Sequence, residues 1–356
     1  MQRPMSTLRL SPQIQAKVLS AGFQMLDDVL QVSALQLSRE TGLSQEEALE
    51  VLQAARKERG ADEAGPSRDG ASVTALDLLH KEESLNRIVT FSSRLDAALG
   101  GGLPLGKTTE ICGAPGVGKT QLCLQLAVDV QVPPCFGGLG GQVVFVDTEG
   151  SFMVQRVTDL AAAAVRHCNL LAEDAEQRDA AGAFTVERVL SNIFLVRCLD
   201  YVELLAEIYL LPDFLSRNPK VRLLVIDSVA FPFRLHFNEL RSQRTRLLNG
   251  LAQQLIALAT KHDVAVVLSN QMTTRLHGGK SQLVPALGES WGHAPTLRIL
   301  LRWAGSQRQA AIVKSPDNKE ATVNYQITTD GFRDSEQPEQ PPSKRTRTLS
   351  NQRDVC

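Results

Sequence analysis

The segment Gly113-Ala-Pro-Gly-Val-Gly-Lys-Thr120 matches the phosphate-binding pattern G-x-x-x-x-G-K-[ST] at every fixed position. Glycines let such a loop wrap closely around phosphates, with its backbone N–H groups pointing inward. The pattern predicts that Lys119 neutralises the β- and γ-phosphates and that the Thr120 hydroxyl ligates Mg²⁺. The residues predicted to bind nucleotide are Gly113, Ala114, Pro115, Gly116, Val117, Gly118, Lys119 and Thr120.

The residues on either side of this loop predict its structural setting. The preceding "TTEI" is β-branched and typical of a strand, and the following "QLCLQLAVDV" has helical spacing. A helix would therefore begin beneath the phosphates, where its N-terminal amides favour negative charge. This strand–loop–helix context argues against a chance match, so nucleotide binding is the first functional prediction.

Composition narrows the remaining classes. A chain of 356 residues has room for one large domain and a small one, and its net charge of −1 means that any basic surface is local. No run approaches the ~18 apolar residues of a membrane helix, and "MQRPMSTLRL" lacks the apolar centre of a secretory signal. Six scattered cysteines without a C-x-x-C pair favour reduced thiols in an intracellular protein over a zinc site or a disulfide framework.

The chain is predicted to have four regions. Residues 1–59 show a pattern of short helices, with Ser44 and Glu47 forming a capping box, and residues 60–79 form a polar linker. Residues 80–334 alternate strand and helix, which predicts an α/β core. Residues 335–356 are rich in proline, glutamine and serine and are expected to be disordered.

The pattern of apolar runs in the core predicts a sheet. The runs "QVVFVDT", "NIFLVRC", "VRLLVID" and "DVAVVLS" are short, as expected for strands covered on both faces, and helical stretches separate them. They predict a mainly parallel sheet flanked by helices. The later runs "TLRILLRW", "RQAAIVKS" and "TVNYQITTDGF" have no long helices between them and are predicted to form antiparallel pairs at the sheet edge.

Three strand ends carry polar residues that complete a nucleotide site. Asp227 ends "VRLLVID" and is predicted to hold a water of the Mg²⁺ shell. Glu149, just after "QVVFVD", is predicted to orient and deprotonate the attacking water; the alternative is that Asp147 and Glu149 cap the next helix. Asn270 and Gln271 are candidates for sensing a γ-phosphate, and a satisfied polar strand end is an equal alternative.

Taken together, these segments resemble the RecA-type recombinases. "RLDAALGGGLPLGKTTEICGAPGVGKTQLCLQLAVDVQ", "VDTEG", "LLVIDSVA", "LSNQM" and "LGESWGHAPTLR" follow the order and spacing of that family over about Val73 to Asp334. The lead-in to the loop and the Gln-Leu-Cys after it are similar to the eukaryotic branch, whose small helical domain the N-terminal helices also resemble. "CFGG", "AFPFR", "RTRLLNGLAQQ" and "LVPALGESWGHA" indicate the recombinase paralogue group within that branch.

The resemblance implies a RecA-like P-loop ATPase core with a small N-terminal helical domain, using ATP and Mg²⁺. It implies homologous-recombination repair of double-strand breaks and crosslinks, with no membrane partner. The expected partners are single-stranded and branched DNA, other recombinase paralogues and the main recombinase, in heteromeric complexes. The expected compartment is the nucleus, with the cytoplasm and the mitochondrion as further compartments.

Individual residues acquire roles from the resemblance. Lys119, Glu149 and Gln271 would be catalytic, with Gln271 coupling the γ-phosphate to the adjoining DNA loop, while Thr120 and Asp227 would hold Mg²⁺. His293 falls where the family keeps a histidine near a neighbour's nucleotide, although a lone histidine is more often structural.

Two loops would face DNA: "SVAFPFRLHFNELRSQRTR" after Asp227, and Met272 to about Ser290. Their cations would bind phosphates without regard to sequence, and their aromatic rings would lie against unstacked bases. The alternatives are arginines on a solvated helix face and phenylalanines packed inward. The candidates are Arg234, Arg241, Arg244, Arg246, Arg275 and Lys280, with Phe231, Phe233 and Phe237.

Two further features, one in the linker and one near the C-terminal end of the sequence, bear on partners and location. Filament-forming relatives join protomers through Phe-x-x-Ala, but Val73 and Leu76 stand at the corresponding positions here, which predicts weak self-polymerisation. Lys344, Arg345 and Arg347 form a basic run that predicts a nuclear import signal; the alternative is a solvated run that aids solubility or touches DNA.

Three functions are compatible with this pattern. The first is a DNA-dependent ATPase whose hydrolysis turns over a protein–DNA complex, and the second is an ATP-loaded scaffold whose hydrolysis is dispensable. The third is a RecA-fold DNA motor, which needs an arginine finger and a ring interface that the sequence does not reveal. A working but weak ATPase used in an adaptor-like way is the reading we favour.

Overall fold

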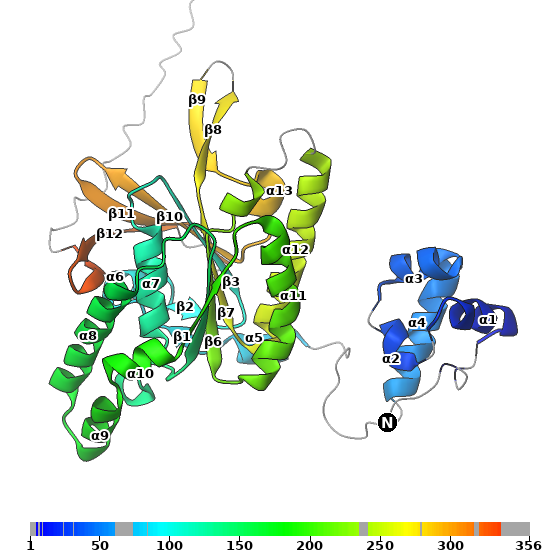
Figure 1. Cartoon of the computed structure of the whole chain (residues 1–356), viewed down its shortest axis with the longest axis horizontal. Helices are drawn as coiled ribbons and strands as arrows, with labels where there is room; N and C mark the ends of the chain where they lie inside the picture. The colour runs from blue at the N-terminus through cyan, green and yellow to red at the C-terminus, as the bar shows by residue number, and fades with distance from the viewer. Residues whose placement is uncertain are drawn as a thin grey trace, which may run out of the picture. The chain divides into compact units, whose positions relative to one another are not determined.

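The computed structural model describes residues 5, 8, 10–23, 25–30, 32–60, 74–83, 85–234, 241–277, 280–316 and 320–335. The chain divides into two compact units, Met1–Lys81 and Glu82–Cys356 (Figure 1). The predicted linker falls largely, and the predicted tail almost wholly, outside the described residues. None of the described helices is both long and apolar enough to cross a membrane.

The N-terminal unit contains short helices, shown in blue in Figure 1. Val18, Leu37 and Val51 are fully buried in its apolar core. The predicted capping box is confirmed, because the Ser44 N–H donates to the Glu47 carboxylate at 2.7 Å and the Glu47 N–H donates to the Ser44 hydroxyl at 3.1 Å. The helices are α1 (Pro12–Ser20), α2 (Leu26–Leu30), α3 (Ala34–Thr41) and α4 (Gln45–Gly60).

A further helix, α5 (Ala75–Glu83), occupies part of the stretch predicted as linker. Thr74 begins it with a cap: the Asp77 N–H donates to the Thr74 hydroxyl at 3.1 Å, and the Thr74 N–H donates to the Asp77 carboxylate at 3.2 Å. Thr-x-x-Asp is therefore a helix-start signal, which the prediction of a linker over residues 60–79 did not take into account. Leu76 lies on this helix with 59% of its surface exposed, while Val73 lies outside the described residues.

The core of the second unit is a nine-stranded sheet in the order β13-β12-β11-β10-β3-β7-β6-β4-β5. From β10 to β5 neighbouring strands run parallel, and from β10 to β13 they run antiparallel, which confirms both predictions made for this sheet. The strands are β3 (Thr108–Gly113), β4 (Gln142–Asp147), β5 (Ile193–Arg197), β6 (Val221–Asp227), β7 (Ala265–Asn270), β10 (Leu297–Ala304), β11 (Gln307–Lys314), β12 (Ala321–Thr328) and β13 (Gly331–Asp334). A short pair, β1 (Arg87–Ile88) and β2 (Leu103–Pro104), lies apart from it.

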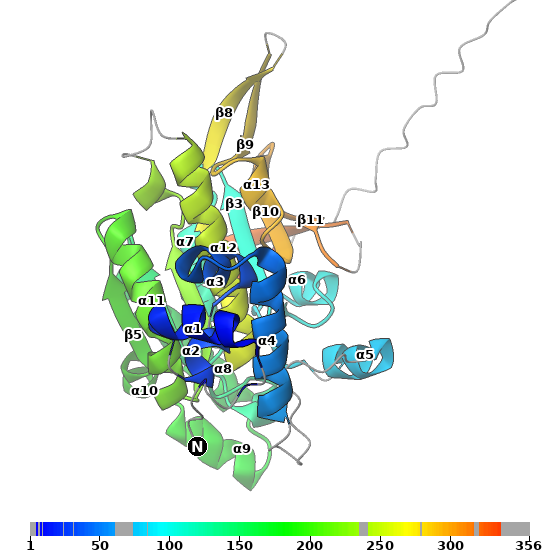
Figure 2. The same cartoon turned by 90° about the vertical axis from the view of Figure 1, so that its right-hand side faces the viewer.

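Helices cover both faces of this sheet, which explains its continuous apolar strands. Along β4, Val143 and Phe145 join one buried cluster while Val144 and Val146 join the other. Figures 1 and 2 show α7 and α8 on one face and α11 and α12 on the opposite face. The helices of this unit are α6 (Ser93–Ala98), α7 (Lys119–Asp129), α8 (Val154–Leu171), α9 (Ala175–Ala183), α10 (Val186–Ser191), α11 (Tyr201–Arg217), α12 (Arg241–His262) and α13 (Glu289–Gly292).

The second stretch predicted as a DNA-facing loop is largely a β-hairpin. Strands β8 (Met272–His277) and β9 (Lys280–Pro285) pair antiparallel from Met272↔Pro285 to His277↔Lys280 and project beyond the main sheet (Figure 1). Two Gly residues separate the two strands in the sequence, and a Gly-Gly pair between such runs is a hairpin signal. The prediction of a loop over this stretch was wrong, because the prediction did not take the Gly-Gly pair into account.

Candidate nucleotide site

The glycine-rich segment occupies the predicted position between β3 and α7. Gly116 and Gly118 have φ angles of 78° and 107°, in the left-handed region that favours glycine. A side chain at Gly118 would collide with Ile327, and a Cβ at Gly113 would lie 2.6 Å from the Leu301 carbonyl oxygen. The fixed glycines of the pattern are therefore required by backbone conformation and by close packing.

Lys119 is the first residue of α7 and is folded back over the loop. Its Nζ donates to the Gly113 carbonyl at 2.9 Å and to the Ala114 carbonyl at 3.2 Å. Burial lowers the pKa of this amine, and the carboxylates of Asp227 and Glu149 act in the opposite direction. The site therefore places one cation between the phosphate loop and two acids.

Asp227 lies at the end of β6 with 2% of its surface exposed. Its carboxylate accepts a hydrogen bond from the Ser269 hydroxyl and lies close to the Thr120 hydroxyl, and burial raises its pKa. Thr120 comes from the phosphate loop and Asp227 from the end of β6, so two oxygen atoms that can ligate a metal ion lie close together beside the loop. Oxygen donors of this kind are the ligands that Mg²⁺ prefers, and the pair therefore fits a magnesium site.

A cavity of about 380 Å³ opens at the loop. Arg308 on β11 brings a guanidinium to its wall, and the Arg308 Nε is buried without a hydrogen-bond partner among the described residues. The guanidinium stacks on the Trp303 ring, 4.3 Å from its centroid, and its unsatisfied N–H suits an anionic ligand such as a phosphate. The cavity is lined by Gly116, Gly118, Lys119, Thr120, Gln121, Arg308 and Ile327.

Four residues of this region were missed by the sequence analysis. Gln121, Arg308 and Ile327 line the cavity, and Arg156 on α8 donates through its Nε to the Gln121 side chain at 2.8 Å. Arg156 also donates to the Thr328 carbonyl at 2.7 Å, which ties α8 to the end of β12. No local pattern marks Arg308 and Ile327, because only the return of the antiparallel strands over the loop brings them there, whereas Gln121 directly follows Thr120 on α7.

Tyr325 on β12 supports the phosphate loop from the same side. Its buried hydroxyl donates to the Val117 carbonyl at 2.6 Å, and its ring stacks on Phe332 with centroids 4.4 Å apart. Burial raises the pKa of this phenol, so it remains a donor at neutral pH. The loop is thus held by a strand that is distant in sequence.

Removal of this hydroxyl is expected to weaken the fold and the site together. Tyr325→Phe leaves the Val117 carbonyl without its donor, which should lower the free energy of unfolding by about 1–2 kcal/mol. Urea denaturation and ATP titration measure the two effects. Tyr209→Phe is the matched control, because Tyr209 is 74% exposed. Equal stability of the two variants would contradict this role for Tyr325.

Asp147, at the end of β4, and Glu149, in the loop that follows, make different contacts. Asp147 accepts from the N–H groups of Ser151 at 3.0 Å and Phe152 at 3.2 Å, so it holds the loop together. The cap position of α8 is Met153, which makes no side-chain cap bond, so neither acid caps that helix. The Glu149 carboxylate instead accepts from the Ser228 hydroxyl and from the Gln271 Nε2, the latter at 2.6 Å.

Asn270, the last residue of β7, and Gln271, which follows it, have side-chain amides in different environments. The Asn270 amide is fully buried and donates to Glu110 at 2.7 Å and to the Ala286 carbonyl at 3.0 Å, as expected for a polar strand end. Gln271 faces the nucleotide site, where it donates to Glu149 and accepts from the Arg234 guanidinium. Of the two candidate sensors, only Gln271 contacts a proposed catalytic residue.

The candidate DNA-binding cations lie in different environments. Arg234 is exposed after a short 3-10 turn, Phe231–Phe233, and Arg275 is exposed on β8, where it pairs with Glu289 at 2.5 Å. Arg244 is half-buried on α12, where burial lowers its pKa, and Arg246 is exposed on the same helix. Arg241 begins α12 and Lys280 begins β9.

The aromatic and terminal candidates complete this comparison. Phe233 is 1% exposed and packs against Tyr201, with ring centroids 5.9 Å apart, so the prediction that it lies against a base was wrong and the inward-packed alternative holds. Phe231 is half-buried, and His293 is exposed at the C-terminal cap of α13. Phe237 and the basic run Lys344, Arg345 and Arg347 lie outside the described residues.

The left-handed glycine loop, the lysine within it and the buried acid on a neighbouring parallel strand define a P-loop nucleotide-binding protein with a RecA-like sheet. A family model described as Rad51 matches residues 81–335. The chain belongs to the Rad51 family, as its resemblance to the RecA-type recombinases predicted.

Individual relatives support this assignment. The chain is 55% identical to "DNA repair protein RAD51 homolog 3" of Cricetulus griseus over 341 residues, covering 94% of this chain and 93% of the relative. It is 42% identical to the protein of the same name in Dictyostelium discoideum, over 74% of this chain and 69% of that protein. It is 32% identical to "DNA repair and recombination protein RadA" of Aeropyrum pernix, over 92% and 95%. The predicted likeness to the eukaryotic paralogue group is thereby confirmed.

Proposed function

We propose that this chain is an ATP-binding protein of homologous-recombination repair, acting on double-strand breaks and crosslinks. It binds single-stranded and branched DNA within heteromeric complexes with other recombinase paralogues, and these complexes assist the main recombinase. It is a weak, DNA-stimulated ATPase, and hydrolysis serves an adaptor-like role. Membership of the Rad51 family and the repair and recombination names of its relatives support this proposal.

The nucleotide site supplies the chemistry for ATP. Bound Mg²⁺ would neutralise charge on the phosphates, and Thr120 and Asp227 are the residues that would hold it. Lys119 leaves the carbonyls of its own loop and turns to the β- and γ-phosphates. Glu149 orients the attacking water and accepts its proton, and its neighbours Ser228 and Gln271 hold the carboxylate in place.

One observation carries the link from ATP to DNA. Gln271 joins the Glu149 carboxylate to the Arg234 guanidinium, and it stands immediately before the β8–β9 hairpin. Arg234 lies within the first DNA-facing stretch, which begins at Ser228, and the hairpin forms most of the second. The Gln271 side chain therefore contacts the proposed catalytic carboxylate and one arginine of the first stretch, and its backbone leads into the second, so a change at the γ-phosphate reaches both.

Co-purification from nuclear extract tests this function. The tagged chain is compared with ATP, with a non-hydrolysable analogue and without nucleotide, and captured proteins and branched DNA are measured. We expect recombinase paralogues to bind in a nucleotide-dependent manner, while the purified chain alone sediments as a small species. Long homofilaments of the chain alone, or capture of neither paralogues nor DNA under any condition, would contradict the proposal.

Nuclear import is expected to depend on the basic run near the C-terminus. Lys344→Ala with Arg345→Ala should move a fluorescently tagged chain to the cytoplasm, because import signals of this kind are recognised through clustered cations. ATP binding should be unchanged, since both residues lie outside the predicted ATPase core. Arg353→Ala is the control from the same segment, and unchanged nuclear levels of the double variant would argue against the signal.

A further inference from the structure

Glu110 is a fully buried carboxylate in the middle of the sheet. It lies on β3, three residues before the first glycine of the phosphate loop, and it is opposite Arg298 on β10 and Leu268 on β7. A carboxylate in such a place is costly unless each oxygen is hydrogen-bonded. Neither the phosphate-binding pattern nor the proposed hydrolysis accounts for it.

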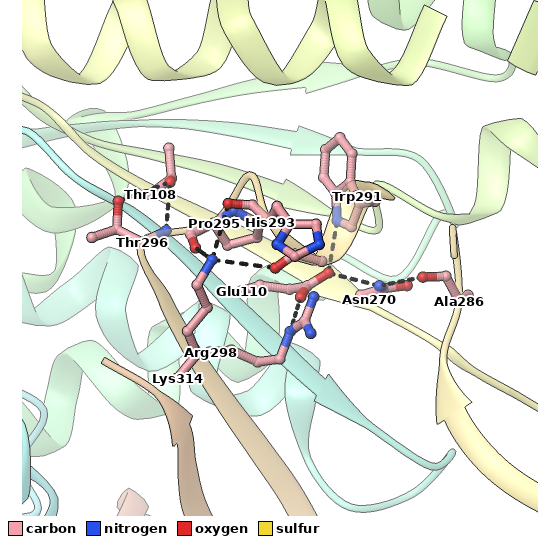
Figure 3. A network of polar contacts seen from close by, with 11 residues as sticks. Thr108, Glu110, Asn270, Ala286, Trp291, His293, Pro295, Thr296, Arg298 and Lys314 are labelled. Carbon is pink, nitrogen blue, oxygen red and sulfur yellow. Dashed lines mark hydrogen bonds and ion pairs between the residues drawn. The ribbon is translucent and has the colours of Figure 1, made fainter. Parts of the chain in front are cut away.

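Three donors from three segments satisfy this carboxylate (Figure 3). Its Oε1 accepts from the Asn270 amide at 2.7 Å and from the Trp291 indole N–H at 2.8 Å. Its Oε2 accepts from the Arg298 Nε at 2.5 Å. The end of β7, the short helix α13 and strand β10 are thus all tied to the strand that carries the phosphate loop.

The same network closes the base of the β8–β9 hairpin. The second proton of the Asn270 amide goes to the Ala286 carbonyl at 3.0 Å, and the Ala286 N–H donates to the Gln271 carbonyl at 2.8 Å. Asn270 and Gln271 precede the hairpin and Ala286 follows it. The amide orientation follows from its partners, because both Glu110 and the Ala286 carbonyl are acceptors.

Helix α13 is joined to the hairpin and to the sheet by further bonds. Lys314 Nζ donates to the carbonyls of His293 at 2.9 Å and Pro295 at 2.7 Å, which holds the turn that follows the helix (Figure 3). Glu289, the first residue of α13, pairs with Arg275 on the hairpin. Trp291 is 2% exposed and packs in the buried cluster, so its indole N–H is held at the carboxylate.

We propose that Glu110 is a positioning residue that couples the phosphate loop to the β8–β9 hairpin, with Trp291 as its second anchor. Gln271 contacts Glu149, and the adjacent Asn270 contacts Glu110, so two paths from the nucleotide site meet at the root of the hairpin. A shift of Gln271 moves Asn270 and Ala286 together as long as Glu110 holds them in register. The inference deepens the proposed function by assigning the residues that transmit the nucleotide state.

Hydrogen exchange of the hairpin tests this coupling without DNA. In the wild-type chain, a magnesium complex of a non-hydrolysable ATP analogue should slow exchange of the amides in residues 272–285 by about fivefold or more. In Trp291→Phe an aromatic ring still occupies most of the site, but the indole N–H is gone. We expect this nucleotide-dependent difference to be lost, while the dissociation constant for the analogue stays within about threefold of wild type.

Glu110→Gln is the second variant, because it keeps the size of the side chain and removes the charge that Arg298 meets. It is expected to lose the same difference. Asp129→Asn is the matched control, since Asp129 is a buried carboxylate on α7 that accepts from Gln125 at 2.6 Å and takes no part in this network. It should change stability but leave the hairpin response intact.

The outcomes separate this inference from the function on which it rests. A wild-type response retained in both Trp291→Phe and Glu110→Gln overturns the inference, as does a loss of equal size in Asp129→Asn. A wild-type hairpin that does not respond although the analogue is bound overturns it as well. A chain that responds in this way but binds no DNA refutes the DNA part of the proposed function and leaves the coupling standing.

Discussion

Lys119→Ala is expected to lower the affinity for ATP by at least about a hundredfold, which corresponds to roughly 3 kcal/mol. The Lys119 amine is the one cation on the phosphate loop itself, and it lies half-buried near the carboxylates of Asp227 and Glu149. Without the amine, these carboxylates would repel the bound phosphates. Isothermal titration with ATP and Mg²⁺ measures the loss. Both the ATPase and the scaffold reading require bound nucleotide, so co-purification of paralogues should fall as well.

Lys107→Ala is the matched control for this substitution. Lys107 directly precedes β3 and pairs with Glu82 at 3.0 Å on the surface, where one ion pair has little effect on stability. Its ATP affinity should equal that of the wild type. An affinity of Lys119→Ala within about threefold of this control would contradict the assignment of the phosphate site.

Glu149→Gln is expected to reduce hydrolysis by about 10²–10⁴-fold while ATP binding is preserved. The amide has the size of the carboxylate and still accepts from Ser228 and Gln271, but it cannot take a proton from water. Single-turnover phosphate release measures the loss, and Glu176→Gln, on the exposed surface of α9, is the control.

The same variant discriminates the ATPase from the scaffold. If turnover of a protein–DNA complex is the function, repair of crosslinks in cells should fail with Glu149→Gln as it does with Lys119→Ala. If nucleotide-gated assembly is the function, Glu149→Gln should support repair and paralogue capture. We expect the second result. Hydrolysis at the wild-type rate in Glu149→Gln would show that another group activates the water.

The parts of the site that the sequence predicted are those whose signals are local. The phosphate loop is one contiguous pattern, and Asp227 and Glu149 follow apolar strands whose carboxyl ends meet at one edge of a parallel sheet. The order of the strands in the sheet was not predicted. The absence of long helices after residue 296 was nevertheless enough to predict antiparallel strands there. The α/β core followed from these two signals.

The parts that could not be predicted depend on contacts between distant segments. Arg308 and Ile327 reach the phosphate loop because β11 and β12 fold back over it, and nothing in their own neighbourhoods indicates this. Adjacent Asn270 and Gln271 are alike in chemistry, and only the direction in which each one points separates structural support from contact with Glu149. Phe233 has an aromatic side chain suited to bases, but packing against Tyr201 determines its position.

The central claim is that a triphosphate and Mg²⁺ are held between the glycine loop and Asp227, close to segments that bind DNA. Its most direct test is fluorescence anisotropy of a branched DNA titrated with the chain and its co-purified partners, in the presence of ATP analogue and Mg²⁺, of ADP, and of no nucleotide. The account predicts a DNA affinity that is highest with the analogue. An affinity for the branched DNA that is absent in all three conditions, or equal with and without nucleotide, would contradict it.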